Sequence, residues 1–220
     1  MKIRTIAATT TLVIAVGAAA GASQLGKIKK QAERTADDIV ETSKEAVRNA
    51  AARQDVTYGV DKVHSTVLFK IQHAKTSNFY GRFDHIDGEW SFDPKSPESG
   101  SFAFDITTSK INTGDRKRDS HLKSADFFNS KQYPKTRFES TSITKGEGDK
   151  FQMDGNLTLL GETLPITTEL EFLGKGNFNG PIAAFEATFT ISRSDFGMSG
   201  FEGGLGDEVT IIVSVEGPQQ

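Results

Sequence analysis

The stretch Thr66-Val-Leu-Phe-Lys-Ile-Gln72 sets the pattern of this chain, because Val67, Phe69 and Ile71 stand at every second position. Successive side chains of a β-strand point to opposite faces of the sheet, so this spacing places the three apolar side chains on one face. The stretch therefore predicts a β-strand that buries one face and exposes the other to water.

The same period of two continues on the C-terminal side, almost to the end of the chain. We count about eight to ten such runs, the clearest of which are residues 79–83, 88–92, 102–106, 157–159, 170–172, 185–191 and 209–215. Turn-forming residues separate many of the runs: Asp93-Pro-Lys-Ser-Pro97, Lys145-Gly-Glu-Gly-Asp149, Leu160-Gly-Glu162 and Gly174-Lys-Gly-Asn177. Short strands with short connections predict an all-β fold, which is either an antiparallel barrel or a sandwich.

One polar segment, residues 113–135, breaks this pattern and is too long for a hairpin turn. Asp115 is placed to cap a short helix over residues 116–123, and Ser124 precedes an expected turn over residues 125–128. A long excursion in a tight meander is usually functional, so we expect a lid or a plug at one end of the barrel.

The N-terminal part of the chain differs in character from the rest. Residues 1–22 combine Lys2 and Arg4 with an apolar run and small residues, which predicts a secretory signal peptide, or an anchor if it is not cleaved. Residues 23–54 are rich in Ala, Lys, Glu and Arg and predict a charged helical spacer; a helix that contacts a membrane surface or a partner through residues 24–54 remains an alternative. Each of these two segments has a net charge of +2. Because the whole chain has a net charge of −3, the remaining residues have a net charge of −7, and in them we expect a barrel domain from residue 55 to about 218.

Composition excludes several classes of protein. The chain has no Cys, so it has no thiol catalysis, disulfides or cysteine-ligated zinc. A net charge of −3 argues against nucleic-acid binding. All 16 Phe lie beyond residue 54, and in a small barrel such rings either line a ligand cavity or fill the interior.

Recognisable catalytic motifs are missing from the sequence. The four His (His64, His73, His85 and His121) show no HExxH spacing, and no Gly-x-Ser-x-Gly elbow or phosphate-binding loop occurs. We therefore expect no enzyme, no cofactor and no metal site. Two polar clusters remain: residues 115–121 are interpreted either as an anion site or as a lid held by Arg–Asp pairs, and residues 192–198 as a structural bridge at a strand end.

These motifs together resemble the YceI family of secreted lipid-binding proteins. The resemblance extends from Tyr58 to Glu216 and is carried by Tyr58-Gly-Val-Asp61, His64-Ser65, His73, Phe79-Tyr-Gly-Arg-Phe83, Gly88-Glu-Trp-Ser-Phe92, Thr113-Gly-Asp-Arg-Lys-Arg-Asp119, His121-Leu-Lys-Ser124, Asp126-Phe-Phe128, Tyr133-Pro134, Phe138-Glu-Ser-Thr141, Gly155-Asn-Leu-Thr158 and Arg193-Ser-Asp-Phe-Gly197. It implies a lipocalin-like, eight-stranded antiparallel β-barrel in the bacterial periplasm. It also implies a bound isoprenoid lipid, such as a polyprenyl phosphate or a quinone.

The leading hypothesis is therefore a noncatalytic carrier or sequestering protein for an isoprenoid lipid. We expect a cavity lined by apolar side chains of the inward face, namely Phe69, Ile71, Phe83, Trp90, Phe104, Phe138, Leu157, Phe172 and Phe189. Arg118 and His121 are the predicted contacts of the lipid headgroup. The alternative is a partner-binding module with a filled barrel, recruited through residues 24–54; a homodimer also remains open.

Overall fold

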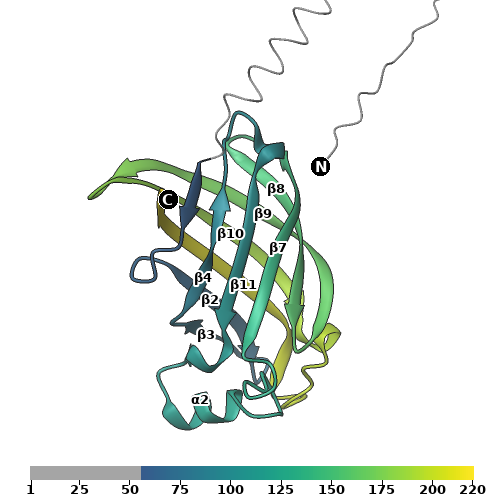
Figure 1. Ribbon diagram of the computed structural model, residues 1–220. Helices are drawn as coiled ribbons and strands as arrows, with labels where there is room; N and C mark the ends of the chain where they lie inside the picture. Colours follow the sequence, from purple (N-terminus) through teal and green to yellow (C-terminus); the bar gives the residue numbers. More distant parts are fainter. Residues whose placement is uncertain (1–55) are drawn as a thin grey trace, which may run out of the picture. The chain divides into compact units, whose positions relative to one another are not determined.

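The computed structural model describes residues 56–220 of the chain (Figure 1). The predictions of a signal peptide over residues 1–22 and of a helical spacer over residues 23–54 lie outside the described residues. Among residues 56–220, no helix is both long enough and apolar enough to cross a membrane.

Most of the described chain is a single antiparallel sheet. Its strands are β1 (Thr57–Gly59), β2 (Thr66–His73), β3 (Ser77–Phe83), β4 (Ile86–Ser91), β5 (Ser101–Thr107), β6 (Ile111–Asn112), β7 (Lys135–Lys145), β8 (Lys150–Leu159), β9 (Glu162–Asn177), β10 (Pro181–Ser192) and β11 (Leu205–Pro218). Four helical segments interrupt them: the 3-10 turns η1 (Pro97–Ser99), η2 (Thr108–Lys110) and η3 (Arg193–Phe196), and the helix α2 (Arg116–Leu122).

The sheet has eleven segments, whereas eight strands were predicted, because three of the strands are each interrupted once. β1 and β2 follow one path, since β1 pairs with β4 while β2 pairs with β3. β3 and β4 follow the next path, and they pair with β6 and β5 respectively. Joining β1 with β2, β3 with β4 and β5 with β6 leaves eight strands in a simple meander.

The meander closes on itself between its first and last strands. β11 pairs with β2, with Val213 opposite Val67, and Tyr58 forms a bridge with Gln219 at the chain's end. Closure pairs the long strands of the described residues on both sides, so that only the short segments β1 and β6 end the strand order. The prediction of an all-β, antiparallel, eight-stranded barrel is confirmed, and the ribbon shows its strands curling around a common interior (Figure 1).

Alternation along the strands fills this interior as the sequence predicts. In β2, Val67 and Ile71 are buried whereas Leu68 is exposed. In β8 every second residue from Phe151 to Leu159 is buried. Apolar burial of this kind contributes about 1.5–3 kcal/mol for each large side chain, so the inward face supplies most of the stabilisation of the barrel.

One half of the barrel is packed solid with aromatic rings. Trp90 is 1% exposed and stacks on Tyr58 with their ring centroids 4.7 Å apart. Phe185 meets Trp90 and Phe102 edge to face, at 5.0 Å from each. Such ring pairs contribute about 0.5–1.5 kcal/mol each beyond the area that they bury, so the ring contacts stabilise this half of the barrel.

Candidate functional site: an apolar cavity beneath a helical lid

The other half of the barrel contains a cavity of about 140 Å³. The inward side chains of β2, β3, β8, β10 and β11 form its wall, and residues of the α2 region cover it. Its lining is almost wholly apolar and comprises Val67, Phe69, Ile71, Phe79, Phe83, Ile106, Arg118, Leu122, Phe127, Phe128, Thr136, Leu157, Leu159, Phe189, Ile191, Arg193, Met198, Leu205, Val209 and Ile211. The sequence left open whether the Phe rings fill the barrel or line a cavity. In the structure they fill one half of the barrel and line a cavity in the other half.

A glycine on β3 makes room for one of the lining rings. Phe69 lies opposite Gly81 in the β2–β3 pair, and a Cβ atom on Gly81 would stand 2.3 Å from the Cζ atom of that ring. The tip of the ring therefore lies close to the backbone of β3, and only a glycine allows so close an approach.

The lid is the predicted excursion, with its helix at α2. The Asp115 carboxylate caps this helix by accepting a hydrogen bond of 2.8 Å from the backbone N–H of Arg118. Asp119 accepts two more, from the backbone N–H and the hydroxyl of Thr113. These bonds fold the polar segment back on itself, so that Leu122 and Phe127 reach the cavity while the charged face of α2 meets solvent.

Arg118 lies at the covered end of the cavity. Its guanidinium stands 4.4 Å from the centroid of the Phe79 ring. It also donates to the hydroxyl and the carbonyl of Thr113, at 2.8 and 2.7 Å. A cation over an aromatic face contributes about 0.5–1 kcal/mol at an exposed site, so Arg118 fastens the lid to β3.

A second arginine, Arg193, is only 4% exposed and lies beside the cavity. It donates three hydrogen bonds to backbone carbonyls: from Nε to Gly206 at 2.9 Å, and from Nη1 to Met198 and Gly200 at 2.8 Å each. Residues 192–198 therefore act structurally, as expected, with loop carbonyls as the partners of the guanidinium.

The neighbouring acid Asp207 completes this arrangement. It accepts hydrogen bonds from the hydroxyl and the backbone N–H of Ser194, at 2.7 and 2.9 Å. These bonds hold the pKa of the Asp207 carboxyl below its usual value, and the charge of Arg193 acts in the same direction. The loop that follows η3 is thus tied down from both sides, which positions Met198 and Leu205 in the cavity wall.

Nine apolar residues were predicted to line a cavity, and the structure divides them into two groups. Five of the nine lie in its wall: Phe69, Ile71, Phe83, Leu157 and Phe189. Four lie elsewhere: Trp90 and Phe104 belong to the ring-filled half, Phe172 packs on Phe92 at 5.6 Å, and Phe138 packs beside the cavity over Gly155. These four lie outside the cavity wall, because alternation decides which face a side chain is on and not how far along the barrel it lies.

The two predicted headgroup residues also separate. Arg118 lines the cavity, whereas His121 does not. The His121 ring is turned to Asp126, with Nε2 3.1 Å from the carboxylate, and packs edge to face on Phe127. His121 thus supports a ring of the lid from outside.

Sequence patterns place this chain among known proteins. Residues 58–217 match the YceI-like domain family. The chain belongs to this family. It is 41% identical over 167 residues to Protein YceI of Escherichia coli O157:H7, a match that covers 74% of this chain and 87% of that protein.

Solved structures similar to this YceI-like chain share its fold. BcnA of Burkholderia cenocepacia superposes with a TM-score of 0.65 at 25% identity, covering 71% of this chain and 98% of BcnA. A polyisoprenoid binding domain from Saccharophagus degradans superposes with a TM-score of 0.57 over 75% of this chain and 99% of that one. At 15% identity this second likeness shows the fold alone.

Sequence reasoning missed the part of the YceI-like cavity that loops supply. Met198 and Leu205 lie on either side of the loop that Arg193 holds, outside any alternating run. Phe127 and Phe128 stand in the polar excursion, and this adjacent pair of rings was the available signal that the lid has an inward face.

Proposed function

We propose that this protein carries or sequesters a long-chain isoprenoid lipid in the periplasm, without catalysing a reaction. The observation that carries the proposal is the apolar cavity, whose polar lining residues within residues 56–220 are Arg118, Thr136 and Arg193. That lining offers no carboxylate, imidazole or thiol for acid–base or nucleophilic chemistry. The likeness of fold to a polyisoprenoid binding domain agrees with this ligand class.

The size of the cavity says how such a ligand would enter. A dry cavity of about 150 Å³ holds one benzene molecule, and the cavity here is about 140 Å³. A chain of several isoprene units needs more room than this. We therefore propose that Leu122, Phe127 and Phe128 move outward with the lid when the ligand enters.

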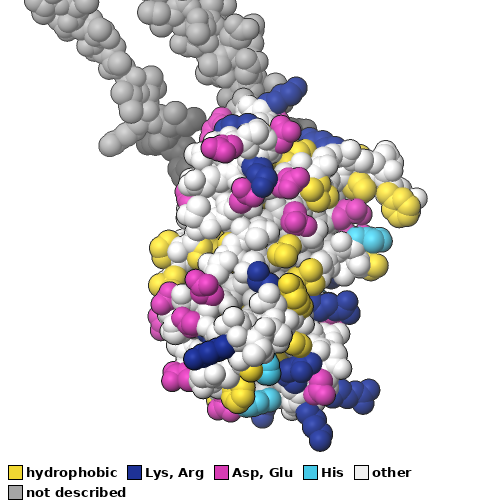
Figure 2. Space-filling model, turned by 180° about the vertical axis from the view of Figure 1, so that it is seen from behind, with side chains coloured by type: hydrophobic (Ala, Val, Ile, Leu, Met, Phe, Trp, Pro, Cys, Tyr) yellow, Lys and Arg dark blue, Asp and Glu magenta, His cyan; other side chains and the backbone are white. Residues whose placement is uncertain are grey.

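The charge around the lid favours an anionic headgroup. Arg116, Lys117, Arg118 and Lys123 all lie on or directly after α2. Basic side chains gather at the end of the molecule where α2 lies, as the space-filling view shows (Figure 2). Among the two lipid classes predicted, a polyprenyl phosphate is thus better matched than a quinone, because a phosphate accepts charge-assisted hydrogen bonds.

Native mass spectrometry of the full chain, expressed in a bacterium and purified from the periplasmic extract, tests the proposal. We expect a bound mass that organic extraction identifies as an isoprenoid, and recovery from that extract tests the periplasmic setting. An empty protein that also fails to take up added polyprenyl phosphate would contradict the proposal and favour the partner-binding module.

Two tryptophan variants of β11 separate the cavity from the outer wall. Ile211 lines the cavity, whereas its neighbour Ile212 belongs to the opposite face and pairs with Leu68. We expect Ile211→Trp to fill the cavity and to abolish lipid retention, while Ile212→Trp retains it. Circular dichroism of both variants establishes that they are folded, and equal retention by the two would contradict the assigned site.

A further inference from the structure

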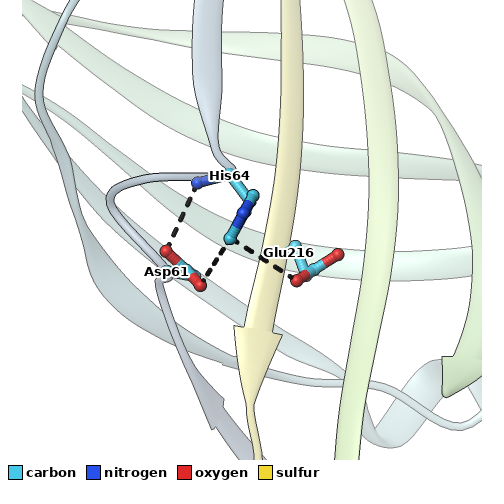
Figure 3. Close-up of side chains that lie close together, drawn as sticks. All are labelled: Asp61, His64 and Glu216. Carbon is cyan, nitrogen blue, oxygen red and sulfur yellow. Dashed lines mark hydrogen bonds and ion pairs between the residues drawn. The ribbon is translucent and has the colours of Figure 1, made fainter. Parts of the chain in front are cut away.

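Three ionisable side chains meet on the outside of the barrel, at the seam between its first and last strands. Asp61 and His64 lie in the break between β1 and β2, and Glu216 lies near the end of β11 (Figure 3). The His64 Nδ1 atom is 2.9 Å from the Asp61 Oδ2 atom and 3.9 Å from the Glu216 Oε1 atom. Ligand atoms of all three residues lie within 4.8 Å of one another.

These separations suit a small divalent cation. Zinc binds imidazole nitrogen and carboxylate oxygen at about 2.0–2.2 Å, so its tetrahedral ligands stand about 3.3–3.6 Å apart. The two separations measured from His64 lie on either side of that range. The two carboxylates, whose ligand atoms lie within 4.8 Å of each other, would have to approach by up to about 1.2 Å to bind the same ion.

Hydrogen bonds from the backbone hold this arrangement in place. The Ser65 hydroxyl donates to the Glu216 carbonyl and accepts from the Glu216 N–H, at 3.1 and 3.2 Å. The Asp61 N–H also donates to the Glu216 carbonyl, at 2.9 Å. Asp61 Oδ1 accepts from the N–H groups of Val63 and His64, which leaves Oδ2 turned toward the imidazole. Such second interactions are typical of the carboxylates and histidines of metal sites.

The local charge favours a cation as well. Two carboxylates face one imidazole in this cluster. The basic side chain in the same break, Lys62, is directed to Asp87 at 3.0 Å. Two carboxylates balance the charge of a divalent ion, and the half-exposed His64 ring leaves it accessible from solvent.

We propose that Asp61, His64 and Glu216 bind one divalent cation of the zinc type, with solvent completing its coordination. The ion would join the start of β2 to the end of β11, between segments that stand 151 residues apart in the chain. It would thereby lock the seam at which the barrel closes, close in sequence to Val67 in the cavity wall.

Isothermal titration of ZnCl₂ into the full, untagged chain after EDTA treatment tests this site. We expect one equivalent to bind and to raise the unfolding temperature, since metal binding to the folded state alone is linked to folding. We expect His64→Ala and Glu216→Gln each to weaken binding at least about tenfold, because even losses of outer interactions cost that much. Glu216→Gln keeps the backbone hydrogen bonds, so it tests the carboxylate without disturbing the seam.

Matched controls stand on the adjoining strands β2 and β11. His73→Ala removes an exposed histidine from β2, and Glu208→Gln removes an exposed carboxylate from β11. We expect both variants to bind zinc as the wild type does. No zinc binding by the wild-type chain, binding that survives His64→Ala, or equal losses in the control variants would each overturn the proposal.

Discussion

Replacing the buried Arg193 by methionine is the sharpest test of how the cavity wall is held. Methionine keeps most of the length and apolar character of the side chain but removes the guanidinium. The carbonyls of Met198, Gly200 and Gly206 then lose their donor.

The magnitude follows from those three hydrogen bonds. A hydrogen bond to a charged group contributes about 1.5–3 kcal/mol, and an unsatisfied buried carbonyl costs about 1–3 kcal/mol. Gly200 and Gly206 are partly exposed, so water reaches their carbonyls once the loop loosens. We therefore expect Arg193→Met to lower the free energy of unfolding by about 2–4 kcal/mol, which is below the simple sum over three such bonds because water replaces part of what is lost.

Urea denaturation followed by tryptophan fluorescence measures this loss. Trp90 is the single Trp of the chain and lies in the ring-filled half, so its emission reports unfolding of the barrel and not of the loop alone. Arg116→Met, an exposed arginine of α2, serves as the control and should change stability by less than about 0.5 kcal/mol. A loss below about 1 kcal/mol for Arg193→Met would refute the view that its hydrogen bonds organise this loop.

Two further predictions concern the inward face and the dependence on pH. Phe104→Asp should abolish the folded state or lower the free energy of unfolding by more than about 3–5 kcal/mol in urea denaturation, because it places a charge among packed rings. Asp105→Asn on the outer face should lower it by less than about 1 kcal/mol. Equal losses for the two variants would contradict the register of β5. Because the pKa of Asp207 is lowered in the folded state, its carboxylate stabilises the protein above its ordinary pKa of about 4, and this contribution disappears as the pH falls below that value. The difference in unfolding free energy between the wild type and Asp207→Ala should therefore be largest near pH 7 and should shrink as the pH falls below about 4, and a difference that does not change with pH would exclude the carboxylate as its source.

The local patterns of the sequence predicted most of the strands and the lid. Alternation in residues 66–72 corresponds to β2, and Asp115 caps α2 as its position before a charged run predicts. Both features depend on residues that are close in the sequence, so they do not require contacts with distant parts of the chain. The break between β1 and β2 could not be predicted in this way, because Ser65 is bonded to Glu216 from the far end of the chain.

The candidate site was predicted only in part for a related reason. Phe83 and Phe104 show the same alternation, yet Phe83 lines the cavity while Phe104 packs on Phe185 with their ring centroids 5.7 Å apart. How far along the barrel axis a side chain lies depends on the register of all the strand pairs around the barrel. Irregularities between Ser140 and Ser142 and between Ala184 and Phe185 shift that register, and no local pattern announces them.

The sequence by itself determined that the chain is an all-β domain with one apolar face, a capped polar lid and no catalytic motif, because these properties follow from the period and chemistry of neighbouring residues. Only the tertiary structure decided which half of the barrel is filled, that the guanidinium of Arg193 is used by loop carbonyls, and that Glu216 joins Asp61 and His64. The cavity and the cluster of Asp61, His64 and Glu216 are each formed by side chains from strands that are far apart in the sequence. Their existence depends on closure of the barrel, which brings the first and last strands together.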